Sequence, residues 1–176
     1  MPCVVADTSP LFYLAYLDRL DLLHSMYEQV NVPDAVWKEA IRGGGRYPDI
    51  IPPMQTARAA GWITVHAHRN WDQREPILAG LDEGEQQALL LALELKAALI
   101  LIDEKHGRRA ALLLGITSTG TVGVLIEGKR RGLVGSVAPL LRTLRDETTF
   151  WLHPEDEARA LALVSEKPDS RSDSLP

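Results

Sequence analysis

The sequence is poor in several residue types, and each shortage excludes a class of protein. Cysteine occurs once, as Cys3, so no disulfide can form within the chain and no cysteine-based zinc site can be built. A single cysteine is also typical of the reducing cytoplasm, where we expect this protein. No apolar run reaches the roughly 18 residues that span a membrane, and no basic segment precedes a long apolar run. We therefore expect neither a membrane anchor nor a signal peptide.

Positive charge is scarce as well. The chain has 19 Lys and Arg residues against 24 Asp and Glu residues, a net charge of −5. This balance argues against a protein that attracts nucleic acid by charge alone, but not against an enzyme that does so through metal ions held by carboxylates. Aromatic residues make up only 6% of the chain and apolar residues 45%, so we expect an aliphatic core sized for one domain.

Strand and helix patterns alternate along the chain. Short apolar runs next to helical spacings of leucine predict an α/β fold with three layers, α/β/α, around a mostly parallel central sheet. We expect strands at residues 3–6, 29–32, 97–102 and 116–119, and an edge strand or an extended segment at 62–68. Helices are expected at 10–27, 33–42, 54–60, 82–96, 104–114, 120–131, 136–146 and 154–166.

The predicted organisation is a main domain, residues 1–153, followed by a C-terminal helix, residues 154–166, and a mobile tail, residues 167–176. The tail is polar and rich in Ser, Asp and Pro, a composition that cannot bury enough apolar surface to fold. Residues 70–81 carry no clear pattern.

Two of the apolar runs end in aspartate, one at Asp7 in "VVADTSP" and one at Asp103 in "ALILIDE". In open α/β sheets ligands bind beyond the carboxyl ends of the strands, so both carboxylates should reach one edge. The simpler alternative is that each caps the helix that follows, because Asp is a favoured N-cap. Their shared position on two parallel strands favours a site.

Two predicted helices add further carboxylates. Glu85 shares the inward face of its helix with Ala88 and Leu89, although Asp82 and Glu85 also have the spacing of a capping box. Glu39, in "PDAVWKEAI", lies at the border of a buried stripe or on a solvated helix face. Four converging carboxylates repel one another, and a divalent cation removes that repulsion. Oxygen ligands alone favour Mg²⁺ or Mn²⁺ over zinc.

These segments together resemble the PIN domain, a small α/β fold of metal-dependent ribonucleases that includes VapC-type toxins. The resemblance covers roughly residues 3–134 and rests on "VVADTSP", "VNVPDAVWKEA", "LDEGEQQALLLA" and "LILIDEKHGRRAA". "GITSTGTVGVL" and "KRRGLV" resemble a PIN subgroup described as predicted nucleic-acid-binding proteins. The resemblance implies a Mg²⁺- or Mn²⁺-dependent endoribonuclease, with RNA as its substrate.

Carried over by position, the resemblance implies that Asp7, Glu39, Glu85 and Asp103 bind the metal and act in catalysis. It further implies that Thr8 or Ser9 orients the Asp7 carboxylate or a water. The chain departs from the pattern at two positions: Glu85 stands where many PIN ribonucleases have Asp, and Lys105 stands where many have another Asp. Both departures bear on a second metal ion.

Three cations are candidates for binding the substrate. Lys105 and Arg108 follow Asp103 closely, and Arg46 stands in the glycine-rich "GGGR" segment that can cover the site. The alternative for Lys105 and Arg108 is an exposed basic helix face. By resemblance we also expect a homodimer and, for a toxin, a small antitoxin as protein partner.

Two other functions compete with the ribonuclease. A haloacid dehalogenase-type phosphatase also starts with a strand and an aspartate, but it needs a second Asp two residues later, where this chain has Ser9. A catalytically weak or inactive PIN module that only binds nucleic acid or a partner is favoured by the acidic net charge and by Lys105.

Overall fold

The computed structural model describes residues 3–67 and 76–168, which belong to two compact units, Met1–Thr121 and Val122–Pro176. The elements of the first unit are β1 (Val4–Ala6), α1 (Thr8–Tyr16), α2 (Asp21–Tyr27), β2 (Val30–Pro33), α3 (Asp34–Gly43), the 3₁₀ turn η1 (Pro48–Ile50), α4 (Ile51–Ala59), β3 (Ile63–His66), the 3₁₀ turn η2 (Pro76–Leu78), α5 (Glu83–Glu94), β4 (Leu99–Leu101), α6 (Lys105–Leu113) and β5 (Ser118–Thr119).

The strands of the described residues form one five-stranded sheet in the order β3-β2-β1-β4-β5. Every pairing in it is parallel, with Val5 beside Asn31 on one side and beside Ile100 on the other. Parallel strands need crossover connections, which the helices between them supply. The predicted parallel sheet is confirmed, and the segment predicted at 62–68 provides its edge strand β3.

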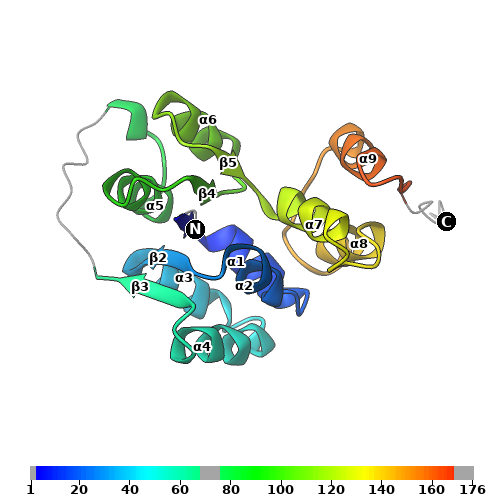
Figure 1. Ribbon diagram of the computed structural model, residues 1–176, viewed down its shortest axis with the longest axis horizontal. Coiled ribbons are helices and arrows are strands. Elements are labelled where there is room, and N and C mark those ends of the chain that lie inside the picture. The colour runs from blue at the N-terminus through cyan, green and yellow to red at the C-terminus, as the bar shows by residue number, and fades with distance from the viewer. Residues whose placement is uncertain (1–2, 68–75, 169–176) are drawn as a thin grey trace. The chain divides into compact units, whose positions relative to one another are not determined.

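Helices cover both faces of the sheet and complete the predicted three layers. The ribbon shows α5 and α6 on one side of the sheet and α1, α2 and α4 on the other (Figure 1). The β1 strand is fully buried, and α5 carries apolar side chains around most of its circumference. Such continuous apolar runs are expected where strands are covered on both faces. The buried α5 thus brings its N-terminus to the carboxyl end of the sheet.

The predicted helix from Pro10 to Tyr27 is wrong in one respect, because the structure divides it into α1 and α2. Asp18 adopts a left-handed backbone with a φ of 54°, which no helix continues through. The Arg19 amide donates instead to the Leu14 carbonyl at 2.8 Å. The leucine spacing continued across this break and concealed it.

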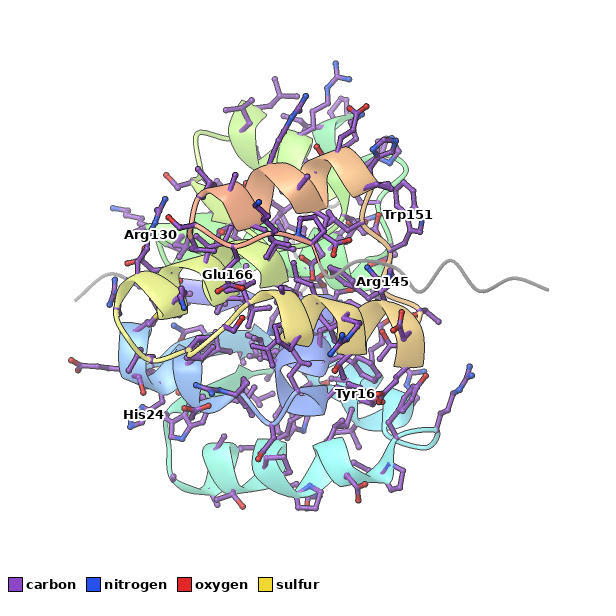
Figure 2. All side chains as sticks on the ribbon, turned by 90° about the vertical axis from the view of Figure 1, so that its right-hand side faces the viewer. Tyr16, His24, Arg130, Arg145, Trp151 and Glu166 are labelled. Atoms are coloured by element: carbon purple, nitrogen blue, oxygen red, sulfur yellow. The ribbon has the colours of Figure 1, made fainter. Side chains whose placement is uncertain are left out.

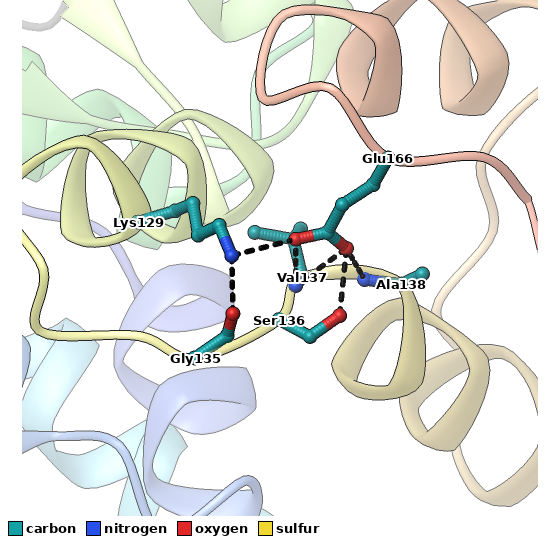
Figure 3. A network of polar contacts seen from close by, with 6 residues as sticks. All are labelled: Lys129, Gly135, Ser136, Val137, Ala138 and Glu166. Atoms are coloured by element: carbon teal, nitrogen blue, oxygen red, sulfur yellow. Dashed lines mark hydrogen bonds and ion pairs between the residues drawn. The ribbon is translucent and has the colours of Figure 1, made fainter.

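The second unit contains most of α7 (Thr121–Arg130), α8 (Ala138–Glu147) and α9 (Pro154–Ala162). Glu166, which follows α9, accepts hydrogen bonds from the Val137 and Ala138 amides and from the Ser136 hydroxyl, at 2.8 to 3.0 Å (Figure 3). Lys129 of α7 pairs with the same carboxylate at 3.4 Å. This one carboxylate therefore joins the segments around all three helices.

Two further features belong to the second unit. Arg145 of α8 donates to both oxygens of Glu157 on α9 at 3.2 Å. Trp151, in the loop between these helices, is 75% exposed and points outward (Figure 2). The predicted division at residue 153 stays a prediction.

Parts of three predicted segments lie outside the described residues: residue 68 of the segment at 62–68, residues 70–75 of the ambiguous stretch and residues 169–176 of the tail. Among the residues that are described, no helix is both long and apolar enough to cross a lipid bilayer.

Candidate functional site

Asp7 occupies the position that the sequence predicts, directly after β1 at the carboxyl end of the sheet. Its side chain is buried, with 4% of the residue exposed, and its amide donates to the Leu101 carbonyl at 2.9 Å. Burial raises the pKa of the Asp7 carboxyl to about 8, and the negative charges of Asp82, Glu85 and Glu39 add to that shift. Asp7 is therefore largely protonated at neutral pH while no cation is near.

Three carboxylates from different parts of the chain surround Gly84 in the first turn of α5. A β-carbon placed on Gly84 would lie 3.0 Å from Glu39 Oε2, 3.3 Å from Asp82 Oδ1 and 3.5 Å from Asp7 Oδ1. Any side chain at this position would occupy the space that the three oxygens face. The glycine thus keeps open a small acidic cradle, the space bounded by these three carboxylates.

Thr8 connects two sides of the acidic cradle. Its hydroxyl donates to Glu39 Oε2 at 2.8 Å, and its backbone hydrogen bond to Asp7 opposes part of the rise in the Asp7 pKa. Thr8 therefore fixes the position of Glu39 on α3 relative to β1. Ser9 is half-buried in the first turn of α1.

Glu85 faces the interior, as predicted, and also forms the capping box that was its alternative role. Its Oε2 accepts the Asp82 amide at 3.1 Å while Asp82 Oδ1 accepts the Glu85 amide at 2.8 Å. Glu85 Oε1 is buried and has no hydrogen-bond partner in the structure. Such an orphaned oxygen is costly unless something binds it. Burial accordingly raises the pKa of the Glu85 carboxyl.

Asp103 also lies at the predicted edge, but its side chain is directed toward the residues after β5. Asp103 Oδ1 accepts the Thr121 amide at 2.7 Å, and Oδ2 accepts the Thr121 hydroxyl at 2.6 Å. A β-carbon on Gly120 would lie 2.3 Å from Asp103 Oδ1, so this approach requires glycine. Burial raises the Asp103 pKa despite these hydrogen bonds.

The predicted cations have different surroundings. Arg108 of α6 donates to the Asp103 carbonyl, and its charge lowers the Asp103 pKa. Lys105 is exposed at the start of α6. Arg46 is exposed in the turn after α3, with its guanidinium carbon 5.5 Å from the centre of the Tyr47 ring. Arg108 and Lys105 therefore flank Asp103, whereas Arg46 lies beside Tyr47 in the turn after α3.

The donor chemistry of the acidic cradle fits a hard divalent cation, although the ligands are not yet gathered. No three Asp, Glu, His or Cys side chains within residues 3–67 and 76–168 are arranged to hold an ion together. The three oxygens of the acidic cradle nonetheless face one small space, and carboxylate oxygens are the ligands that Mg²⁺ prefers. Glu39 and Asp82 are exposed, so their carboxylates could turn toward an ion, although the hydrogen bond from Thr8 and the capping box hold them in their present positions.

Asp82 and Thr121 are the two site residues that the sequence prediction missed. Asp82 was assigned only a capping role, and Thr121 only a place in a helix. Their positions in the sequence could have indicated them. Asp82 directly precedes α5 and Thr121 is the first residue of α7, and helices that begin at the carboxyl edge of a parallel sheet often carry site residues. The charge of Asp82 near Asp7 and the hydrogen bonds of Thr121 to Asp103 appear only once the chain is folded.

Comparison with known proteins agrees with this architecture. A family model described as a PIN domain matches residues 3–166, a longer span than residues 3–134, which carry the motifs. No curated protein matches the chain. The five-stranded parallel sheet, with Asp7 and Asp103 after strands β1 and β4, is consistent with that match, which gives no support to the phosphatase alternative. The chain belongs to the PIN-domain family.

Proposed function

We propose that this protein is a Mg²⁺- or Mn²⁺-dependent endoribonuclease. The observation that carries the proposal is the acidic cradle at Gly84. The neighbouring residue, Glu85, adds a buried carboxylate whose orphaned Oε1 faces Gly107 of α6. PIN domains are generally nucleases and typically use divalent metals, which agrees with this donor set. Carboxylates that are buried together and raise one another's pKa are typical of functional sites.

In the proposed site Asp7, Glu39, Glu85 and Asp103 hold the metal, and we add Asp82 to this set because it faces the same space. A divalent cation in such a site stabilises negative charge on the phosphate and makes water a better nucleophile at neutral pH. Asp7 must lose its proton before its carboxylate can bind a cation, so metal binding is expected to release protons.

Neighbouring residues would position the ligands and the substrate. Thr8 fixes the Glu39 carboxylate, and Thr121 fixes Asp103 through both of its oxygens. Arg108 and Lys105 place positive charge beside Asp103, where they can contact a phosphate. Cleavage thus depends on carboxylates for the metal and on this small basic edge for the substrate.

The proposal is tested by cleavage of a mixed single-stranded RNA by the purified protein in Mn²⁺, Mg²⁺ or EDTA. We expect cutting in the metal lanes only, and its loss in Asp7→Asn. Asp156→Asn is the matched control, since it makes the same change at an exposed residue of α9. Cutting by Asp7→Asn at the rate of the unsubstituted protein would refute the proposed site.

A nucleic-acid-binding module without turnover is the second candidate function. It is favoured by the absence, among the described residues, of any three Asp, Glu, His or Cys side chains arranged to hold one ion. Calorimetric titration with Mn²⁺ separates the two functions. Tight Mn²⁺ binding together with RNA binding, but without cleavage of any RNA, identifies the module.

The protein partners and the cellular location stay predictions. Leu112 and Leu113 on α6 are 75% and 64% exposed, an apolar surface that a second copy or an antitoxin can cover. Light scattering of the purified protein tests the homodimer. Co-purification of the product of a neighbouring gene tests the antitoxin.

A further inference from the structure

Three aromatic rings and one guanidinium form a continuous patch on the first unit. Tyr47 lies between Phe12 and Tyr16, with ring centres 5.4 Å and 5.2 Å away and interplanar angles of 77° and 83°. The Arg46 guanidinium carbon lies 5.5 Å from the centre of the Tyr47 ring. All three rings are half-buried and Arg46 is exposed. We call these four residues the aromatic surface.

The local sequence explains how the aromatic surface forms. Phe12 and Tyr16 are four residues apart and therefore share one face of α1. Tyr47 lies in the turn after α3, which is drawn in cyan, and Tyr16 lies next to this turn (Figure 2). A β-carbon on Gly43 would lie 3.3 Å from the Phe12 ring, so glycine lets the end of α3 approach α1 closely.

The aromatic surface begins one helical turn from the acidic cradle. Phe12 follows Thr8 by one turn of α1, and Gly43 follows Glu39 by one turn of α3, while Thr8 and Glu39 are hydrogen-bonded to each other at 2.8 Å. A rise of 1.5 Å per residue places Phe12 about 6 Å and Tyr16 about 12 Å beyond Thr8 along the helix axis. A strand that leaves the cradle along α1 meets these rings within a few nucleotides.

Charge gives the aromatic surface its preference for a polyanion. The chain has a net charge of −5, so its overall field does not attract RNA. Arg46 and the neighbouring exposed Arg42 supply cations locally, at the end of α3. Arginine beside aromatic rings is the combination that binds single-stranded nucleic acid, because phosphates contact the guanidinium while bases stack on the π faces.

We propose that the aromatic surface is a base-stacking platform for single-stranded RNA that extends from the acidic cradle. The inference rests on the proposed ribonuclease function and adds where the bases of its substrate bind, on rings that bases already stacked within a duplex could not reach. Every base has a π face, so the platform selects single strands without selecting a sequence. A protein partner on the same rings is the competing occupant.

The first test measures binding without cleavage, by fluorescence anisotropy of labelled RNA with the Asp7→Asn protein. The probes are a 12-nucleotide oligoadenylate, the same length of abasic strand, and the oligoadenylate paired with its complement. We expect the oligoadenylate to bind most tightly. Tyr16→Leu should weaken its binding by roughly tenfold and Tyr16→Phe should not, since only the first removes the ring.

Tyr27→Leu is the matched control, because Tyr27 is a half-buried tyrosine of α2 outside the aromatic surface. Circular dichroism melts of each variant show whether it is folded. If Tyr16→Leu fails to fold, photo-crosslinking of the unsubstituted chain to RNA that carries 5-iodouridine, in EDTA, gives the answer instead. An adduct on Phe12, Tyr16 or Tyr47 supports the platform, and adducts confined to other residues overturn it.

The outcomes separate this inference from the proposed function. Equal binding of the abasic strand and the oligoadenylate refutes the platform even if the protein cleaves RNA. Ring-dependent binding by a protein that cleaves no RNA supports the platform and refutes the ribonuclease. RNA binding that is unchanged in Tyr16→Leu overturns the proposal.

Discussion

Replacing Asp7 by asparagine tests the electrostatics of the site in the absence of metal. The folded protein raises the Asp7 pKa from its ordinary value of 3.8 to about 8, so the folded state holds a proton that the unfolded chain releases. The stability that comes from this group is therefore complete below pH 3.8 and is lost as the pH rises through about 8. Asparagine is neutral throughout and lacks this dependence.

The size of the effect follows from proton linkage. One proton bound only in the folded state changes the free energy of unfolding by about 1.4 kcal/mol per pH unit. Between pH 5 and pH 7.5 this amounts to about 3 kcal/mol. For a chain of this length each kcal/mol corresponds to roughly 2–4 °C. Between pH 5 and pH 7.5 the melting temperature of the unsubstituted protein should therefore fall by about 6–12 °C more than that of Asp7→Asn.

Thermal melts in EDTA at the two pH values, followed by circular dichroism, measure this difference, with Asp156→Asn as control. At pH 7.5 excess Mn²⁺ should make the unsubstituted protein more stable than Asp7→Asn, because an ion that binds only the folded state stabilises it by mass action. Parallel pH dependences for Asp7→Asn and the unsubstituted protein in EDTA would refute a protonated, buried Asp7. The acidic cradle would then have to be open to solvent.

Three further predictions follow from particular contacts. Gly84→Ala should leave the melting temperature in EDTA nearly unchanged, because the flexible end of Glu39 can yield to the new methyl group, but should weaken Mn²⁺ binding in calorimetry by filling the cradle. Thr121→Val removes the hydroxyl that donates to Asp103 at 2.6 Å and should lower the free energy of unfolding by about 1–3 kcal/mol in urea titrations. Glu166→Gln should destabilise the protein by up to about 3 kcal/mol at pH 7. Burial acts to raise the pKa of Glu166, but its hydrogen bonds together outweigh burial and lower that pKa from 4.5 to about 2. The stability that Glu166 contributes is therefore present above pH 4.5 and lost as the pH falls through about 2. Melts of Glu166→Gln that differ from the unsubstituted protein equally at pH 7 and pH 2 would contradict this.

Part of the candidate site was predictable because the periodicity of the chain predicts its topology. Apolar runs that end in Asp7 and Asp103 predict parallel strands, and parallel strands direct their carboxyl ends to one edge. The capping box at Asp82 and Glu85 was also visible, since it depends on a spacing of three residues. Contacts between residues close in sequence can be recognised without a fold.

The contacts that define the site join residues far apart in the chain, and no spacing or motif in the sequence indicated them. Glu39 meets Thr8 across 31 residues, and Thr121 meets Asp103 across 18. Whether Glu85 has a partner for its second oxygen depends on how α5 packs against α6. The helix break at Asp18 was missed because the leucine spacing continued through it.

By itself the sequence determined the order of strands and helices, the buried faces of those elements and the carboxylates at their ends, since these depend on composition and spacing. Only the tertiary structure decided which carboxylates share a space, that Asp82 joins Asp7 and Glu39 at Gly84, and that Tyr47 reaches the rings of α1. The physical reason is that a side chain's pKa and contacts depend on neighbours and solvent exclusion, which exist only when the chain is packed.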